Sequence, residues 1–299
     1  MTKQVDTWPE SKAGYKEGLA LSSIKNIKQD TKYKQSARKP SASKKAIRSS
    51  KPRGKKKSKK TMRPFWVGLA ILIGLVMIVL YVELFMEKRR VTWPEGFNVY
   101  GIDVSHYQED VDWAKIKAGE VSFAFMKATE GISLKDKQFE KNWQATADAS
   151  IIRGAYHFYL PYLSPEKQAE HFIRTVTLSP GDLPPVLDVE VKGRKTKEQL
   201  QKDVKVWLRK VENAYGVKPI IYTGYTFYKD YLAGEFDDYP LWIAHYKVDK
   251  LKLEKDYKTK LAFWQHTDDG KVDGIERSVD CNVFYGSMRD LKGLCIQPK

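Results

Sequence analysis

An apolar run over residues 65–82 constrains this 299-residue chain more than any other feature of its sequence. The run holds 18 residues without a charged side chain, and a helix of that length spans about 27 Å. That span approaches the ~30 Å hydrocarbon core of a bilayer, and Leu84 to Met86 can lengthen it. Trp66 and Tyr81 stand near the two ends, where aromatic rings favour the membrane interface. The sequence therefore predicts a transmembrane helix over residues 65–86.

Two other interpretations of this run are less favoured. A buried core helix of this length usually carries a polar stripe, and the run has none. A cleaved signal peptide needs a short basic region before the run and small residues after it. Here 64 residues precede the run, and the segment from Glu83 to Arg90 offers no small-residue cleavage site. We therefore expect an uncleaved membrane anchor.

The net charge of +16 belongs to the segment before the anchor. Residues 1–64 carry 20 Lys and Arg against 4 Asp and Glu, whereas the remaining 235 residues carry 33 of each sign. Few large apolar side chains accompany the lysines, which predicts a disordered tail. Basic segments stay on the cytoplasmic side of a membrane helix, so the tail is expected in the cytoplasm and the rest of the chain in the periplasm or on the cell-wall side. The neutral remainder has no positive field for phosphates, which argues against nucleic acid as a partner.

The chain beyond the anchor is long enough for one large domain. We expect a linker over residues 87–98 and a single domain over residues 99–299. Cys281 and Cys295 could form a disulfide in an extracytoplasmic compartment, or remain two buried thiols, and the sequence leaves both possibilities open. Neither these cysteines nor the scattered histidines show a metal-binding spacing, so we expect no metal and no cofactor. The oligomeric state does not follow from the sequence.

Short apolar segments recur along this domain, with helical patterns between the earlier ones. Strands are expected at residues 99–104, 123–127, 154–159, 185–189, 219–223, 241–244, 261–265 and 278–282. Helices are expected to begin near Asp136, at Ser164–Pro165 and at the capping box Thr196–Gln199. Strands that alternate with helices predict an α/β fold with a mainly parallel sheet, and eight of them predict a closed barrel whose helices shorten late in the chain.

Polar and aromatic side chains stand at the end of nearly every expected strand. They are Asp103, Lys127 with Glu130, Tyr156 with His157, Asp188 with Glu190, Tyr222, Trp242, Trp264 with Gln265, and Asp280. The carboxyl ends of barrel strands meet at one face, where such folds place their sites. We therefore expect these side chains to converge at one mouth, with Lys127 and Glu130 paired across it.

Asp188 and Glu190 form the sharpest element of this set. Side chains two residues apart in a strand point the same way, so the two carboxylates are expected roughly 7 Å apart after an apolar run that desolvates them. Cleavage of a glycosidic bond uses one protonated carboxyl group and one ionised carboxylate, and crowded acids in an apolar mouth separate their pKa values in that sense. A single Asp-x-Glu pair is more often solvated or salt-bridged, so the pair alone is weak support.

Eight motifs in order give a more specific indication. They are Tyr100–Gln108, Met126–Gly131, Arg153–Phe158, Pro185–Glu190, Ile221–Gly224, Leu241–Ala244, Trp264–Gln265 and Val279–Asn282. Together they resemble the glycoside hydrolase family 25 lysozymes, or N-acetylmuramidases, over residues 99–287. The resemblance implies a TIM-like (β/α)5(β)3 barrel. It also implies hydrolysis of the β-1,4 bond between N-acetylmuramic acid and N-acetylglucosamine in the glycan strands of peptidoglycan.

The resemblance also implies roles for individual residues. Glu190 is expected to be the general acid, with Asp188 as its partner and with Asp103 and Asp280 completing the acidic ring. Asp188 could be a nucleophile, could activate water, or could orient the substrate's 2-acetamido group, and the ~7 Å spacing does not choose among these roles. Substrate contacts are expected from Tyr156, Tyr222, Trp242, Trp264 and Gln265. Each of the four aromatic rings could instead belong to the barrel core.

A second class of function remains open at this point. The barrel could be a catalytically inactive, membrane-tethered scaffold that binds peptidoglycan, with the Lys-rich tail engaging a cytoplasmic partner. Retention of all four acids favours the enzyme, because a binding protein does not need them. The sequence therefore favours a membrane-anchored lysozyme.

Overall fold

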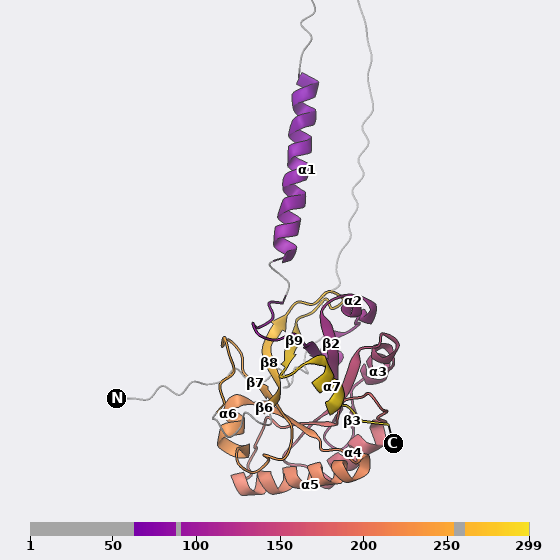
Figure 1. Cartoon of the computed structure of the whole chain (residues 1–299), viewed down its shortest axis with the longest axis vertical. Coiled ribbons are helices and arrows are strands. Elements are labelled where there is room, and N and C mark those ends of the chain that lie inside the picture. Colours follow the sequence, from indigo (N-terminus) through magenta and orange to yellow (C-terminus); the bar gives the residue numbers. More distant parts are fainter. Residues whose placement is uncertain (1–62, 88–90, 254–260, 299) are drawn as a thin grey trace, which may run out of the picture. The chain divides into compact units, whose positions relative to one another are not determined.

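The structure, a computed structural model, describes residues 63–87, 91–253 and 261–298. Helix α1 (Arg63–Glu87) covers the expected transmembrane segment and exceeds it by two residues at its start and one at its end (Figure 1). Its segment Trp66–Glu83 is long and apolar enough to cross a membrane by length and composition, with a mean hydropathy of 2.4. The expected disordered tail lies outside the described residues, apart from Arg63 and Pro64, which begin α1.

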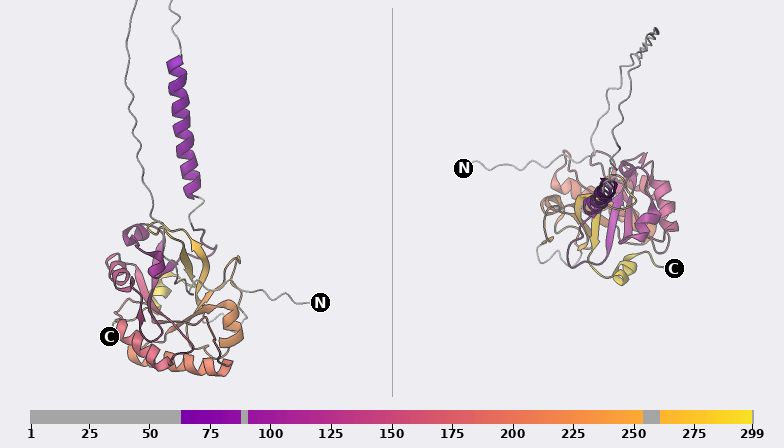
Figure 2. Two further views of the ribbon diagram at one scale, coloured as in Figure 1. Left: turned by 180° about the vertical axis from the view of Figure 1, so that it is seen from behind. Right: turned by 90° about the horizontal axis from the view of Figure 1, so that it is seen from above.

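Eight strands close into a barrel in the remainder of the described chain (Figures 1 and 2). They are β1 (Tyr100–Val104), β2 (Val121–Glu130), β4 (Ile152–Phe158), β5 (Val186–Asp188), β6 (Ile220–Gly224), β7 (Leu241–Ala244), β8 (Leu261–Gly270) and β9 (Val279–Phe284). Their order is β1-β9-β8-β7-β6-β5-β4-β2, and pairing of β1 with β2 closes the ring. A short strand, β3 (Leu134–Lys135), folds back onto β2. Every expected strand is confirmed to within a few residues.

Helices follow the first five barrel strands. They are α2 (Trp113–Ala118), α3 (Phe139–Asp148), α4 (Pro165–Thr175), α5 (Lys197–Tyr215) and α6 (Tyr225–Phe227), which continues as the helical turn η2 (Tyr228–Leu232). No helix follows β7 or β8 in the described residues, and α7 (Met288–Leu294) comes after β9. A single 3-10 turn, η1 (His106–Gln108), follows β1. Five strand–helix units and three further strands make a (β/α)5(β)3 barrel, as expected.

Local sequence signals account for the helix boundaries. The Ser164 hydroxyl accepts a hydrogen bond from the backbone of Lys167 at the start of α4. Thr196 and Gln199 form the predicted capping box of α5, and Gly216 ends that helix in a left-handed conformation. The start of α3 differs from the expectation, because the helix begins at Phe139 rather than Asp136.

The direction of β9 decides which residues reach the mouth of the barrel. Neighbouring strands from β1 through β2 to β8 are parallel, whereas β9 is antiparallel to both β8 and β1. The beginning of β9 therefore lies at the rim where the parallel strands end. Asp280, the second residue of β9, pairs with Asp103 of β1 in this register.

Side chains alternate between the barrel interior and the layer beneath the helices. The interior holds mainly aromatic rings: Phe125 stacks on Trp242 with centroids 4.4 Å apart, and Phe123 lies 5.2 Å from Phe263. Gly101 and Gly154 leave room for these rings, because a Cβ atom at Gly101 would lie 2.2 Å from Phe123 and one at Gly154 would lie 2.5 Å from Phe125. Large rings opposite glycines thus fill the interior below the mouth.

Part of the expected linker packs on the barrel. The Val91 amide donates to the Lys271 carbonyl at 3.0 Å. The Trp93 ring stacks on Tyr100 at 4.6 Å, and its Nε1 donates to Glu120 Oε2 at 2.9 Å. Phe97 contacts the ring of Tyr285 edge-on at 4.9 Å. Residues 91–97 therefore cover part of the barrel wall where no helix follows the strands.

The two cysteines are free and buried in the structure. Cys281 belongs to the layer outside the sheet, and Cys295 packs with the residues that fill the interior. Of the two possibilities that the sequence left open, the structure has the pair of unbridged thiols.

We predict that Gly101→Ala destabilises the barrel by about 1–3 kcal/mol, because the added methyl group overlaps the Phe123 ring in a close-packed interior. Gly293→Ala is the matched control, since nothing lies within 4 Å of its Cβ position in α7. Thermal unfolding of the purified protein, followed by near-ultraviolet circular dichroism, should show a lower Tm for the first variant only. Equal Tm values for both variants would contradict the packing argument.

Candidate active site

Four carboxylates meet at the mouth of the barrel. Asp103 lies on β1, Asp188 ends β5, Glu190 stands two residues beyond, and Asp280 begins β9. Asp103 and Asp188 are buried, and Glu190 and Asp280 are half-buried. The charges of Asp103 and Glu190 raise the pKa values of Asp188 and Asp280, and the charge of Asp103 raises that of Glu190. The structure therefore brings together all four acids that the sequence singled out.

Asp103 is the most firmly held of the four. Its Oδ2 accepts hydrogen bonds from Gln265 Nε2 and from Asn282 Nδ2, both at 2.8 Å. Those amides are oriented in turn, because Gln265 Oε1 accepts from the Tyr222 hydroxyl at 2.7 Å and Asn282 Oδ1 accepts from Trp242 Nε1 at 2.8 Å. Burial raises the pKa of Asp103 to about 6, although the hydrogen bonds from Asn282 and Gln265 oppose that rise.

Asn282 and Tyr246 are site residues that the sequence reasoning did not single out. Tyr246 donates from its hydroxyl to Gln265 Oε1 at 2.5 Å. A signal was available for Asn282, because it lies two residues after Asp280 in the same strand and so faces the same side. Tyr246 follows β7 by two residues, where no regular pattern indicates the direction of its side chain.

Asp188 and Glu190 are two further acids of the group whose pKa values are raised. Asp188 Oδ1 is buried and has no hydrogen-bond partner among the described residues. Burial first, and then the charge of Glu190, raise the pKa of Asp188 well above its ordinary value, while Lys127 opposes the rise. Burial and the charge of Asp103 raise the pKa of Glu190, and interaction with Tyr222 and the charge of Lys127 oppose that rise. A carboxyl group of this kind retains its proton at a higher pH than an exposed one.

Asp280 completes the acidic group beside Asp103. Burial raises the pKa of Asp280 well above its ordinary value, and the adjacent Asp103 adds to the rise. Two acids in neighbouring positions on β1 and β9 cannot both carry a full charge at low cost, so they titrate as a pair. The mouth is therefore a place where protons are held near neutral pH.

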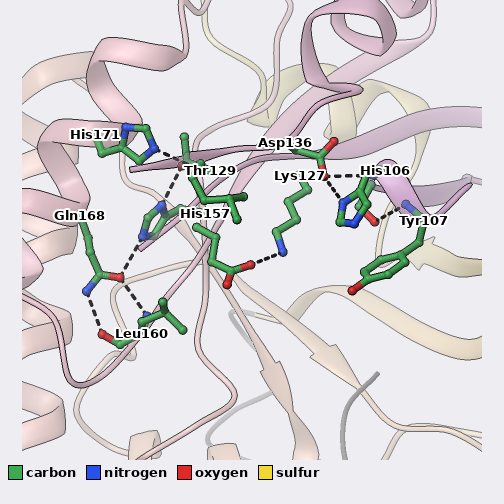
Figure 3. Close-up of polar contacts among 12 residues, drawn as sticks. His106, Tyr107, Lys127, Thr129, Asp136, His157, Leu160, Gln168 and His171 are labelled. Atoms are coloured by element: carbon green, nitrogen blue, oxygen red, sulfur yellow. Dashed lines mark hydrogen bonds and ion pairs between the residues drawn. The ribbon is translucent and has the colours of Figure 1, made fainter. Parts of the chain in front are cut away.

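Lys127 brings the positive charge that partly balances these acids. Its ammonium group pairs with Glu130 Oε2 at 2.6 Å, as the sequence predicts, and the Lys127 side chain is buried (Figure 3). The ammonium also lies 4.9 Å from the centre of the Phe158 ring. This position accounts for its effect on the pKa values of both Asp188 and Glu190.

The expected aromatic contacts divide into two groups. Tyr156 and Tyr222 face the acids, whose charges, after burial, raise the pKa of both phenols. Trp242 is 1% exposed in the barrel interior, and Trp264 is 1% exposed in the layer outside the sheet, where its Nε1 donates to the His245 carbonyl. Neither tryptophan ring has a free face for a sugar, which corrects the expectation for these two residues.

The adjacent positions of Gln265 and Trp264 in β8 explain why only one of the two side chains reaches the mouth. Neighbouring residues in a strand point to opposite faces, so the two side chains cannot both reach the mouth. Gln265 faces the acids and is buried at 1% exposure, which makes it a support for Asp103 rather than an open contact surface.

No group of three or more His, Cys, Asp or Glu side chains in the described parts of the chain is arranged to hold a metal ion. His157 is fully buried between Thr129 and Gln168, and burial lowers its pKa to about 3, so it is neutral (Figure 3).

A barrel of this topology with desolvated carboxyl groups at its mouth is typical of the glycoside hydrolases. The family profile of glycosyl hydrolases family 25 matches residues 102–275. This chain belongs to that family.

Similar proteins and structures agree with this assignment. Uncharacterized protein YegX of Escherichia coli K12 is 44% identical over 204 residues, which are 67% of this chain and 74% of that protein. Lysozyme M1 of Streptomyces globisporus is 32% identical over 221 residues, 70% of this chain and 75% of that protein. A family 25 glycosyl hydrolase from Bacillus anthracis has a similar structure, with a TM-score of 0.64 at 34% identity, covering 69% of this chain and 98% of that one. The bacterial lysozyme from Streptomyces coelicolor gives a TM-score of 0.62 at 31% identity, over 67% and 98% of the two chains.

We predict that Lys127→Met raises the pKa values of Asp188 and Glu190, because it removes the positive charge that favours their ionised forms. A rise is expected for both groups, because a nearby opposite charge favours the ionised form of a carboxyl group. The measurement is a pH titration of the ¹³C-labelled carboxyl groups by NMR.

Glu130→Gln is the opposite control for this prediction. The Glu130 charge raises the pKa of Asp188, so its removal should lower that pKa while Lys127 stays in place. Shifts of the same sign in both variants would mean that Lys127 does not set the electrostatics of the mouth.

Proposed function

We propose that this protein is a membrane-anchored N-acetylmuramidase that hydrolyses the β-1,4 bond between N-acetylmuramic acid and N-acetylglucosamine in peptidoglycan. The observation that carries the proposal is the group of four acids at the barrel mouth, in which Asp188 and Glu190 are desolvated side by side. Membership of family 25 and similarity to Lysozyme M1 support the choice of substrate.

Glu190 acts as the general acid in this proposal. Burial and the charge of Asp103 raise its pKa, so the carboxyl group keeps its proton to a higher pH than an exposed glutamate and can donate it to the leaving glycosidic oxygen. Glu190 is also more exposed than Asp188, which gives it the better access to a substrate above the mouth.

Asp188 is the partner that stabilises positive charge at the anomeric carbon. Its Oδ1, which makes no hydrogen bond in the described structure, is available to attack that carbon, to activate water or to orient the substrate's 2-acetamido group. The anomeric configuration of the first product distinguishes these routes. Direct attack by activated water inverts the configuration, whereas attack by Asp188 or by the 2-acetamido group retains it. Asp103 and Asp280 together hold one negative charge and one proton beside Asp188 and Glu190. They thereby set how readily Asp188 and Glu190 ionise.

Tyr156 and Tyr222 are the proposed sugar contacts at the point of cleavage. Both face the acids, and Tyr222 is linked to Asp103 through Gln265. Their phenol groups remain protonated because burial raises their pKa values, so the Tyr156 hydroxyl can donate a hydrogen bond to the sugar, whereas the Tyr222 hydroxyl already donates to Gln265.

The membrane position belongs to the same proposal. Helix α1 is the anchor, the Lys-rich residues 1–64 lie in the cytoplasm, and the barrel lies outside the membrane where peptidoglycan is found. The charge difference across the helix supports this orientation, with 20 basic residues before it and Lys88, Arg89 and Arg90 directly after it.

We predict that Glu190→Gln lowers the rate of peptidoglycan hydrolysis by about 10²–10⁴-fold, the range that a general acid contributes. The amide has nearly the same shape as the carboxyl group, so the Tm of the barrel should stay close to that of the unchanged protein. The measurement is the release of reducing ends from purified peptidoglycan, with mass spectrometry expected to find N-acetylmuramic acid at those ends.

Glu276→Gln provides the matched control, because this exposed acid lies on the β8–β9 connection and should leave the rate unchanged. Full activity of Glu190→Gln would reject the role of Glu190. Binding of peptidoglycan with no cleavage by the unchanged protein would instead favour the inactive scaffold.

We also predict that protease added to intact spheroplasts digests the barrel and spares a tag placed at residue 1. Positive charge before α1 holds that end in the cytoplasm, where the protease has no access. Immunoblots against the tag and against the barrel provide the measurement. A tag that is digested, or a barrel found in the soluble fraction after carbonate extraction, would contradict the anchored orientation.

A further inference from the structure

The barrel exposes five large apolar side chains, and all of them stand on connections that follow barrel strands at the mouth. They are Tyr107, Ile132, Leu134, Tyr162 and Val191, here termed the apolar arc. These loops follow β1, β2, β4 and β5, which are consecutive neighbours in the sheet. Tyr162 is 76% exposed and Tyr107 is 50% exposed. Outside α1, the described residues include no other exposed large hydrophobic side chain.

A buried carboxylate fastens the first loop of the apolar arc to the second. Asp136 lies in the loop after β2, and its Oδ2 accepts from the His106 amide at 3.0 Å and contacts His106 Nδ1 at 2.7 Å (Figure 3). Its other oxygen accepts from the Gln138 amide at 2.9 Å. Tyr107 follows His106 directly, and its ring lies 4.2 Å from the imidazole ring. The exposure of Tyr107 is therefore a fixed feature of this loop.

Close packing joins the remaining loops of the apolar arc. Gly131, after β2, lies so near Leu160 and Leu163, after β4, that a Cβ atom would approach them to 2.9 and 3.0 Å. Gly193, after β5, comes close to Pro161 in the same way, at 3.2 Å. The four loops therefore form one continuous wall.

Buried amide and imidazole groups hold the middle of this wall in place. Gln168 Oε1 accepts from the Leu160 amide at 2.9 Å, and Gln168 Nε2 donates to the Leu160 carbonyl at 3.0 Å. His157 contacts Gln168 through Nε2 and Thr129 of β2 through Nδ1 (Figure 3). His171 Nε2 contacts the Leu134 carbonyl at 3.0 Å. Tyr162 and Leu134 are thus presented by ordered backbone.

A rigid surface with several exposed apolar groups indicates an interaction site. The strands that carry the apolar arc are those that supply Asp103, Lys127, Tyr156 and Asp188, so the arc continues the acidic mouth on one side. The loop over residues 159–164 has no charged residue. An apolar wall with two exposed tyrosine rings and with no charge in its central loop matches the C–H faces of neutral sugar rings.

We propose that the apolar arc binds the peptidoglycan glycan strand beyond the cleaved bond, with sugar rings stacked on Tyr107 and Tyr162. The inference rests on the proposed function and adds an extended surface that favours long strands over short fragments. The strand crosses the mouth from the acids toward the loops after β1 to β5. Ile132, Leu134 and Val191, the other exposed members of the arc, supply further apolar contact.

The test uses full-length protein in detergent and carries Glu190→Gln in every sample, so that binding is measured without cleavage. Tyr162→Ala and Tyr107→Ala should each weaken co-sedimentation with insoluble peptidoglycan by about 3- to 10-fold, the usual effect of losing one aromatic stacking contact. Tyr162→Phe keeps the ring and should bind as well as its parent. Without Glu190→Gln, Tyr162→Ala should raise KM for peptidoglycan and leave kcat unchanged.

A second substrate distinguishes glycan from peptide as the bound part. Glycan strands freed of their peptides by an amidase should show the same loss of binding in Tyr162→Ala. A loss seen only with the peptides present would overturn the proposal in favour of peptide recognition, and unchanged binding of both alanine variants would overturn it outright. If the proposed function is wrong, the unchanged protein will not cleave peptidoglycan. That result is distinct from unchanged binding by the alanine variants.

Discussion

The burial of several carboxyl groups at one barrel mouth is the constraint to which the rest of the site responds. Each acid loses hydration there, and the charges of Asp103 and Glu190 raise the cost of ionising their neighbours. The surrounding residues compensate selectively: two amides hold Asp103, and Lys127 opposes the pKa rise of Asp188 and Glu190. Asp188 is left with a buried oxygen that no described group satisfies. Unequal compensation gives neighbouring acids different proton affinities, which acid-assisted bond cleavage requires.

Closure of the sheet produces this crowding. Parallel strands place Asp103, Lys127, Tyr156 and Asp188 at one rim, and the reversed last strand adds Asp280 and Asn282 to it. Strands β7 and β8, which no helix follows in the described residues, need another cover, and residues 91–97 supply part of it through Val91, Trp93 and Phe97. The segment that follows α1 is therefore also part of the barrel's packing.

Much of the fold could be predicted from local patterns. Apolar runs predict the eight strands because a strand buried on both faces has to be apolar throughout, and caps such as Ser164 and Thr196 are visible because they bond to backbone a few residues away. The roles of Trp242 and Trp264 could not be read in this way, because an aromatic residue at a strand end suits either a sugar contact or a core. Strand alternation could have predicted that the supporting amide of Asn282 faces the acids. The direction of the Tyr246 hydroxyl could not be predicted, because Tyr246 stands in a loop whose side chains follow no regular period.

The sequence by itself determined the apolar helix, the order of strands and helices, the position of the four acids at strand ends and, through eight ordered motifs, the family. These features depend on residue type and on spacing within a few positions. Only the tertiary structure decided the partners of each acid, the reversal of β9, the burial of both tryptophans, the unbridged cysteines and the continuous apolar arc. Those features arise from contacts between residues that are distant in the chain, such as Asp103 with Asn282 and His106 with Asp136. Burial and the resulting pKa shifts exist only once such contacts have excluded water.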